Sequence, residues 1–113
     1  MISNELLESM VQEIRRGSIV LCVLSRLGEP KYGYALLTEL NEKGLNLDAG
    51  TLYPLLRRLE KQGLLESQWN TDGAKPRKYY CMNMDGRDAL GKLKESWSRI
   101  SEIVEDMLGE DGK

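Results

Sequence analysis

The stretch Asp48-Ala-Gly-Thr-Leu-Tyr-Pro-Leu-Leu-Arg-Arg-Leu-Glu-Lys-Gln-Gly63 decides the fold of this 113-residue chain. Its leucines recur at the spacing of one helix face and form an apolar stripe that must be buried: Leu52, Leu55, Leu56 and Leu59. Asp48 is a good N-cap, and Gly63 suits the left-handed position just past the last turn. Because Pro54 has no backbone N–H, we expect the regular helix to begin near Gly50 or Thr51, or to bend there.

The opposite face of this predicted helix is small and basic. It carries Gly50, Thr51, Tyr53, Pro54, Arg57, Arg58 and Lys61. Glu60 is the only acid nearby, so the face is suited to lie on a polyanion. A solvated helix face explains the same charges when the helix is considered alone, and the neighbouring segments decide between the two interpretations.

Two further helices are predicted before this one. Apolar spacing indicates a long helix over residues 4–27, with a bend expected at Gly17-Ser18 and a second half that is buried nearly all round. A shorter helix over residues 32–43 follows, in which Gly33 permits close approach of another backbone, and Gly44 ends it. Joined by residues 45–47 to the basic helix, it predicts a helix-turn-helix.

After Gly63 the apolar period changes from helical to about two. A first strand over residues 64–69 should place Leu65, Ser67 and Trp69 on its drier face. Residues 71–76 contain Asp-Gly and Pro, which predict a turn, and a second strand over residues 77–84 should place Tyr80, Met82 and Met84 on one face.

This hairpin is basic near its tip, through Lys75, Arg77 and Lys78. A helix-turn-helix followed by a basic hairpin predicts a winged helix-turn-helix, whose second motif helix enters the DNA major groove while the wing lies on the backbone. The ordinary polarity of turns is the other explanation for these three residues.

A last helix, which we expect Asp85 to cap, closes the chain. Its apolar residues recur at spacings of three and four, as in a coiled-coil seam: Leu90, Leu93, Trp97, Ile100, Val104 and Met107. Packing on its own domain is one explanation, but the helix projects beyond a domain already complete at the wing. We therefore predict a seam facing a second copy, with residues 1–84 as the winged helix-turn-helix domain and residues 85–113 as the dimerisation helix.

Composition narrows the function. With 41% apolar and 30% charged residues the chain is typical of a globular protein, and its longest apolar run is too short for a membrane span, so we expect it in the cytoplasm. The chain has no histidine, and Cys22 and Cys81 lie far apart, which argues against a zinc site and favours buried, reduced thiols. No catalytic constellation, metal ligand set or cofactor motif is present, so we expect no enzyme and no cofactor.

Several segments together resemble the PadR family of bacterial transcriptional regulators. They are Tyr32 to Leu37, Gly50 to Leu65, the wing strand from Lys75 to Tyr80, and Asp85-Gly86, within a resemblance that covers about Arg16 to Ile100. The single C-terminal helix is similar to that of the short PadR subgroup. The resemblance implies a mainly α fold with a small antiparallel β-hairpin, and a homodimeric repressor that binds operator DNA near its own gene and often near efflux or detoxification genes, and releases it when a small molecule binds.

The resemblance also implies roles for individual residues. DNA contacts would fall on Thr51, Tyr53, Arg57, Arg58 and Lys61 of the helix, and on Lys75, Arg77 and Lys78 of the wing. One group of short members binds flat aromatic drugs between paired tryptophans at the dimer centre. By position Trp97 would stack on the ligand, with Ile14, Ser18 and Ile100 beside it. A tryptophan at a seam position could equally pack the dimer core without any ligand.

A second function remains open from the residues. The scaffold could serve as a protein-interaction module whose last helix pairs with a different protein, without sequence-specific DNA binding. A net charge of −2 and a pI of about 5.2 favour this alternative. The basic helix face and basic wing, on adjacent elements, oppose it.

Overall fold

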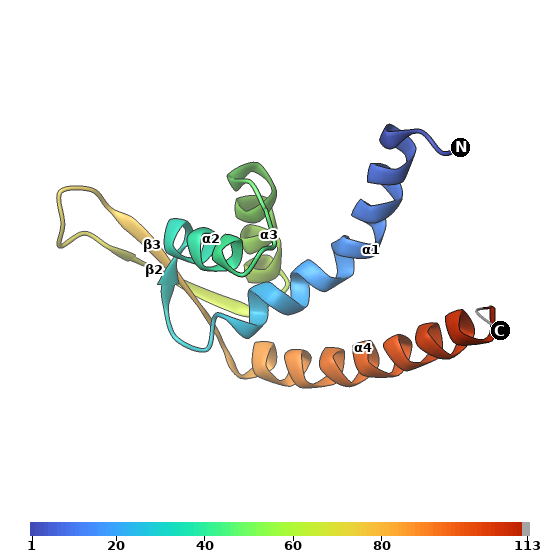
Figure 1. Cartoon of the computed structure of the whole chain (residues 1–113). Coiled ribbons are helices and arrows are strands. Elements are labelled where there is room, and N and C mark those ends of the chain that lie inside the picture. The colour runs from blue at the N-terminus through green and yellow to red at the C-terminus, as the bar shows by residue number, and fades with distance from the viewer. Residues whose placement is uncertain (112–113) are drawn as a thin grey trace.

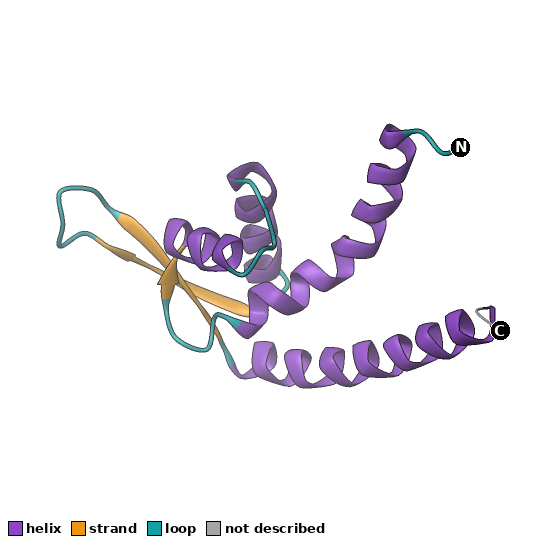
Figure 2. Cartoon of the chain, in the orientation of Figure 1, coloured by secondary structure: helices purple, strands orange, loops and turns teal. Residues whose placement is uncertain are grey.

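Four helices and a three-stranded antiparallel sheet make up residues 1–111, the part of the chain that this computed structural model describes (Figures 1 and 2). The elements are α1 (Asn4–Ser25), β1 (Lys31–Tyr32), α2 (Gly33–Glu42), α3 (Ala49–Lys61), β2 (Leu65–Asn70), β3 (Arg77–Met82) and α4 (Met84–Asp111). The predicted dimerisation helix was to continue to residue 113, and its last two residues lie outside the described part. No helix within residues 1–111 is long and apolar enough to cross a membrane.

The predicted fold class, mainly helical with a winged helix-turn-helix, is confirmed, but the sheet has one more strand than the predicted hairpin. Its order is β1-β3-β2, with Lys31 opposite Tyr80 and Tyr32 opposite Tyr79. The predicted start of the second helix at Tyr32 is wrong, because pairing with β3 holds Tyr32 extended and α2 begins at Gly33.

The core lies where α1, α2, α3 and the base of the sheet meet. All four stripe leucines of α3 are buried, and Leu24, Leu36 and Leu52 are fully covered. Only the C-terminal half of α1 contributes to this cluster, through Ile19, Val23 and Leu24. The predicted burial of this half nearly all round is wrong, because its other side lines a groove, and the helix ends at Ser25 instead of residue 27. Its N-terminal half extends away and leaves apolar side chains exposed: Leu6, Leu7, Met10, Val11 and Ile14. Figure 1 shows that α1 is not straight.

Both ends of α3 have the predicted caps. The Asp48 carboxylate accepts a hydrogen bond from the Thr51 N–H at 2.7 Å, and the helix begins at Ala49, slightly before the predicted start. Pro54 lies within the helix on its exposed face, where the carbonyl left without a partner can face water. Gly63 adopts φ +85° and completes a Schellman motif, in which its N–H donates to the Glu60 carbonyl and the next N–H donates to the Leu59 carbonyl.

The start of α4 corrects two predictions. Met84 belongs to the helix and is exposed, so it does not extend the inner face of the strand. The cap is Asn83, whose side-chain oxygen accepts from the Gly86 N–H at 2.8 Å, while Asp85 lies in the first turn. From there α4 runs beside the C-terminal part of α1, and the far end of α4 and the N-terminus lie away from the wing (Figure 1).

Candidate nucleic-acid interface

The outer face of α3 is exposed and cationic. Thr51, Arg57, Arg58 and Lys61 are exposed, whereas Tyr53 is half-buried. Among residues 1–111 none of the three cations, Arg57, Arg58 and Lys61, takes part in an ion pair. Their charges are therefore directed to solvent and remain available to a polyanion.

Tyr53 is positioned by a close crossing of α2 and α3. A Cβ added at Gly33 would lie 2.4 Å from Tyr53 Cε1, so only glycine leaves room for the ring. The predicted close approach at Gly33 is present, but the neighbour is a side-chain ring rather than a backbone. This contact fixes Tyr53 at the edge of the basic face.

The wing presents its basic residues in two different states near its tip. Lys75 in the turn is exposed. Arg77, at the start of β3, is also exposed, but its guanidinium carbon lies 4.5 Å from the centroid of the Tyr32 ring. That cation–π contact restrains Arg77 beside β1, with its charge still open to solvent.

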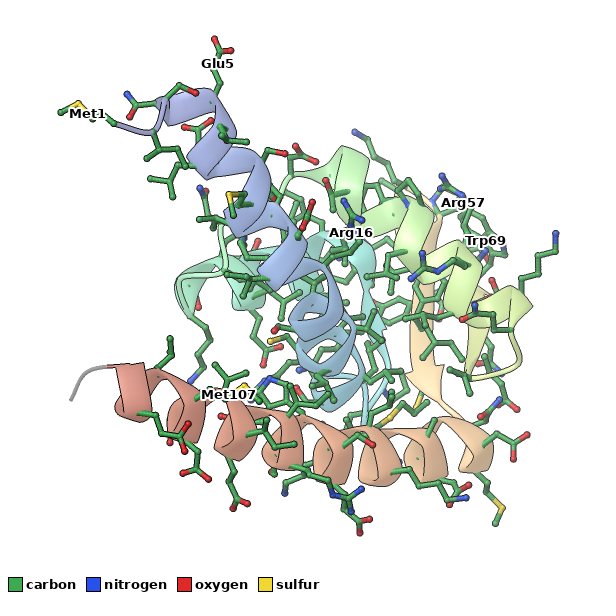
Figure 3. The ribbon with its side chains drawn as sticks, turned by 90° about the vertical axis from the view of Figure 1, so that its right-hand side faces the viewer. Met1, Glu5, Arg16, Arg57, Trp69 and Met107 are labelled. Carbon is green, nitrogen blue, oxygen red and sulfur yellow. The ribbon has the colours of Figure 1, made fainter. Side chains whose placement is uncertain are left out.

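An aromatic groove of about 250 Å³ lies between α3 and the wing. Its lining includes Tyr34, Tyr53, Arg57, Trp69 and Arg77, and Figure 3 shows Arg57 and Trp69 on the same side of the molecule. Trp69 lies on the same face of β2 as Leu65 and Ser67, as predicted, but it is 64% exposed, so the expected burial of this face does not extend to it. The outer end of β2 extends past the core, so the alternation of apolar and polar residues along this strand no longer predicts which side chains are buried at that end. The sequence pattern alone does not predict that Trp69 belongs to this surface.

Lys78 differs from the other wing cations because it is paired. Its Nζ lies 3.4 Å from a Glu60 carboxylate oxygen, and the other oxygen of that carboxylate accepts a hydrogen bond from Ser67. The Ser67 hydrogen bond and Lys78 hold the pKa of Glu60 below its ordinary value, against the opposing effect of burial. Glu60 thus joins the helix to the wing, a role that its position in the sequence does not predict.

A second groove, of about 390 Å³, lies between α1 and α4. It is lined by Ser18, Leu21, Cys22, Ser25, Leu90, Lys94 and Trp97. The fold thus brings together two of the predicted ligand residues, Ser18 and Trp97, and leaves Ile14 and Ile100 outside this lining, exposed. Cys22 and Cys81 are free and half-buried, and not fully buried as expected.

The predicted seam is largely uncovered in the single chain. Leu93, Trp97, Ile100, Val104 and Met107 are exposed, with Trp97 at 51%, and Leu90 is half-buried against the core. Ile103 and Leu108 on the same helix are also exposed. Figure 3 shows α4 along the lower side of the domain, with Met107 near its far end.

Comparison with known proteins decides the family. The model of the transcriptional regulator PadR-like family matches residues 20–92. The chain belongs to the PadR-like family. It is therefore a DNA-binding transcriptional regulator and not an enzyme.

Solved structures and curated relatives agree with the assignment. A PadR family transcriptional regulator from Eggerthella lenta is 47% identical, with a TM-score of 0.87 over 93% of this chain and 94% of that one. A PadR-like regulator from Bacillus cereus is 33% identical, with a TM-score of 0.75 over 85% and 96%. A transcriptional regulator from Mycobacterium tuberculosis is 33% identical over 100 residues, which cover 88% of this PadR-like chain and 91% of that protein.

Proposed function

We propose that this PadR-like protein is a homodimeric cytoplasmic repressor of its own gene and of efflux or detoxification genes, released from DNA by a small aromatic effector. The observation that carries the DNA-binding part is the outer face of α3, whose three cations form no ion pair within residues 1–111 and lie on the element next to a basic wing. Residues 1–84 are the DNA-binding domain in this proposal, and residues 85–113 form the dimerisation helix.

The basic face of α3 and the basic wing make different contacts with DNA. Thr51, Tyr53, Arg57, Arg58 and Lys61 contact base edges and neighbouring phosphates from the major groove, where an arginine can bind guanine through two hydrogen bonds. Lys75 and Arg77 at the wing contact phosphates and supply affinity that depends on salt. Lys78, the remaining predicted DNA contact, is paired with Glu60, and its role is considered in the next subsection.

Dimerisation supplies the second half-site contact. The apolar seam of α4 is too exposed for a monomer in water, and the exposed apolar residues of α1 add to the same liability. A second copy that covers Leu93, Trp97, Ile100, Val104 and Met107 removes this surface from water. Half-buried Leu90 lies at the domain end of the same seam. A two-fold dimer reads a palindromic operator.

The effector site in this proposal is the groove between α1 and α4. Trp97 is a stacking surface for a planar aromatic molecule, Ser18 lines the same groove, and Ile14 and Ile100 would complete the site from outside the lining seen in one chain. An effector here changes the angle between the C-terminal helices and so the spacing of the two α3 helices. The alternative, in which Trp97 only packs the dimer core, predicts no effect of aromatic compounds on DNA affinity.

The test is fluorescence anisotropy with DNA from just upstream of the gene, at two salt concentrations, with scrambled duplex as the competitor. Wild-type protein should prefer the upstream DNA, and Arg57→Ala should remove most of the preference, a loss of about tenfold or more. Arg99→Ala is the matched control, since Arg99 is an exposed arginine of α4 that is not at a seam position.

A different outcome favours the second candidate function. If no duplex is preferred at any salt concentration, the winged scaffold acts as a protein-interaction module, which the acidic pI of about 5.2 favours. If the preference is present and Arg57→Ala retains it, the assignment of base contacts to this face of α3 is wrong.

A further inference from the structure

Glu60 is the one acid on the exposed side of α3 that also touches both strands of the wing. It lies one residue before the end of the helix. One carboxylate oxygen accepts a hydrogen bond from the Ser67 hydroxyl of β2, and the other lies 3.4 Å from Lys78 Nζ of β3. A single carboxylate therefore connects α3 to both strands.

The strand register places the two partners on one face of the wing. Ser67 is opposite Tyr80 and Trp69 is opposite Lys78, so Ser67 and Lys78 are diagonal neighbours on the face that α3 covers. Tyr80 is buried at this point, and Lys78 Nζ lies 5.2 Å from the centroid of its ring. The contact thus sits at the outer limit of the core, where the hairpin leaves the domain.

The same groups are partly shielded from water. The Glu60 and Lys78 side chains are about two-thirds covered, at 32% and 29% exposure. Burial acts to lower the pKa of Lys78, but Tyr80 and Glu60 outweigh it and raise that pKa. Both groups stay charged at neutral pH, and the shielding strengthens their attraction relative to a fully exposed pair.

We propose that Glu60, Lys78 and Ser67 form a latch that fixes the angle between the wing and the recognition helix α3, with Lys78 acting as a positioning residue and not as a phosphate contact. The inference rests on the proposed DNA interface. Lys75 and Arg77 lie further out on the hairpin than Lys78. Without the latch the hairpin samples a range of angles, so it must be ordered before these two charges reach the phosphates while α3 holds the base edges. The latch sets this angle before DNA binds.

The competing interpretation makes an opposite prediction. If Lys78 leaves Glu60 to bind a phosphate, Glu60 is only a competitor for that lysine and a negative charge near the DNA. Removing the Glu60 charge would then tighten DNA binding. In the latch, removing either partner weakens binding, and removing both is no worse than removing one.

The experiment is a double-mutant cycle in DNA affinity. Wild type, Glu60→Gln, Lys78→Met and the double variant are titrated with the preferred duplex at several salt concentrations, with unfolding midpoints recorded for each. Glu39→Gln is the matched control. Glu39 of α2 pairs with Lys31 of β1, so this variant also removes one negative charge and one ion pair between a helix and a strand, but outside the wing hairpin. Ser67→Ala, which retains both charges, is a milder variant should a charge variant fold poorly.

The latch predicts that Glu60→Gln and Lys78→Met each weaken DNA binding about fivefold, that the double variant is no weaker than either, and that Glu39→Gln has no such effect. The slope of affinity against salt should not change, because no phosphate contact is lost. Hydrogen exchange should quicken in residues 65–82 of the latch variants.

Three results would overturn the proposal: tighter binding by Glu60→Gln, a salt slope for Lys78→Met that falls by about 0.9 as for one lost phosphate contact, or additive losses in the double variant. Unchanged affinity in all latch variants alongside a loss in Arg57→Ala would reject the latch and leave the proposed interface standing. If every variant, Arg57→Ala included, keeps its preference for the specific DNA sequence, that interface is rejected instead.

Discussion

Substituting Gly86 by alanine tests how α4 is attached to the winged domain. A Cβ at this position would lie 2.2 Å from the Leu64 carbonyl oxygen, about 1 Å inside the ordinary C···O contact distance. The same carbonyl accepts a hydrogen bond from the Asn83 N–H at 3.3 Å, next to the cap of α4. The backbones of α4 and the segment before β2 must therefore separate, because neither neighbour is a flexible side-chain end.

The magnitude follows from two opposing contributions. Overpacking against a fixed neighbour costs about 1–3 kcal/mol, whereas replacing a helical glycine by alanine contributes up to about 1 kcal/mol of stability. Gly91→Ala in the same helix isolates the second contribution, since a Cβ there meets nothing within 4 Å. The two variants should thus differ in free energy of unfolding by about 1–3 kcal/mol, with Gly91→Ala the more stable.

Urea unfolding monitored by circular dichroism measures this difference. All samples are held at one protein concentration, because the stability of a dimer depends on concentration. With a urea dependence of about 1–3 kcal/mol per molar, the midpoints of the two variants should be separated by roughly 1 M. Equal midpoints for Gly86→Ala and Gly91→Ala would refute the close approach of α4 to Leu64.

Four further predictions concern other parts of the structure. Asp48→Ala removes the cap of α3 and should lower the free energy of unfolding by about 1 kcal/mol in the same urea assay; an unchanged midpoint would mean that another group caps the helix. Lys31 lowers the pKa of Glu39, and the Ser67 hydrogen bond lowers the pKa of Glu60. Each carboxylate therefore stabilises the fold above its ordinary pKa of 4.5, and this stability is lost as the pH falls below that value. Glu60→Gln should thus reduce the change in the urea midpoint between pH 6 and pH 4. Lys75→Ala should weaken binding to all duplexes and reduce the salt slope by about 0.9, whereas an unchanged slope removes Lys75 from the phosphate contacts. Trp97→Phe should abolish the release of DNA by planar aromatic compounds, measured by the anisotropy of a labelled duplex so that the signal does not depend on the substituted tryptophan; if sedimentation shows only a weakened dimer and compounds still release DNA, Trp97 packs the dimer core and the effector binds elsewhere.

The recognition helix could be predicted almost completely from the sequence. Asp48, the leucine stripe and Gly63 act within a few residues of one another, and so their meaning does not depend on the rest of the fold. The helix-turn-helix and the basic hairpin could be predicted for the same reason, because their signals are also local. Only the effect of Pro54 was misjudged, because its cost depends on whether the freed carbonyl of Gly50 faces water.

Other features required the folded chain. The sequence around Tyr32 is typical of a helix, and only its pairing with β3 makes this residue extended. The two residues of β1 are too few to show the alternation of a strand. Trp69 alternates correctly along β2, yet it is exposed because the hairpin extends beyond the core. Asn83, and not Asp85, caps α4, because the position of the last strand decides where the helix can begin.

The chain's local chemistry therefore determined by itself which segment forms α3 and which residues form its basic face. Tertiary structure alone decided that Lys78 pairs with Glu60 while Arg57 pairs with no acid in the described part of the chain, and that Ser18 and Trp97 line one groove. The physical reason is the separation along the chain of the groups that interact. Caps and helix stripes are set by contacts within one or two turns, whereas the state of a charge or an aromatic ring depends on partners that only packing brings near.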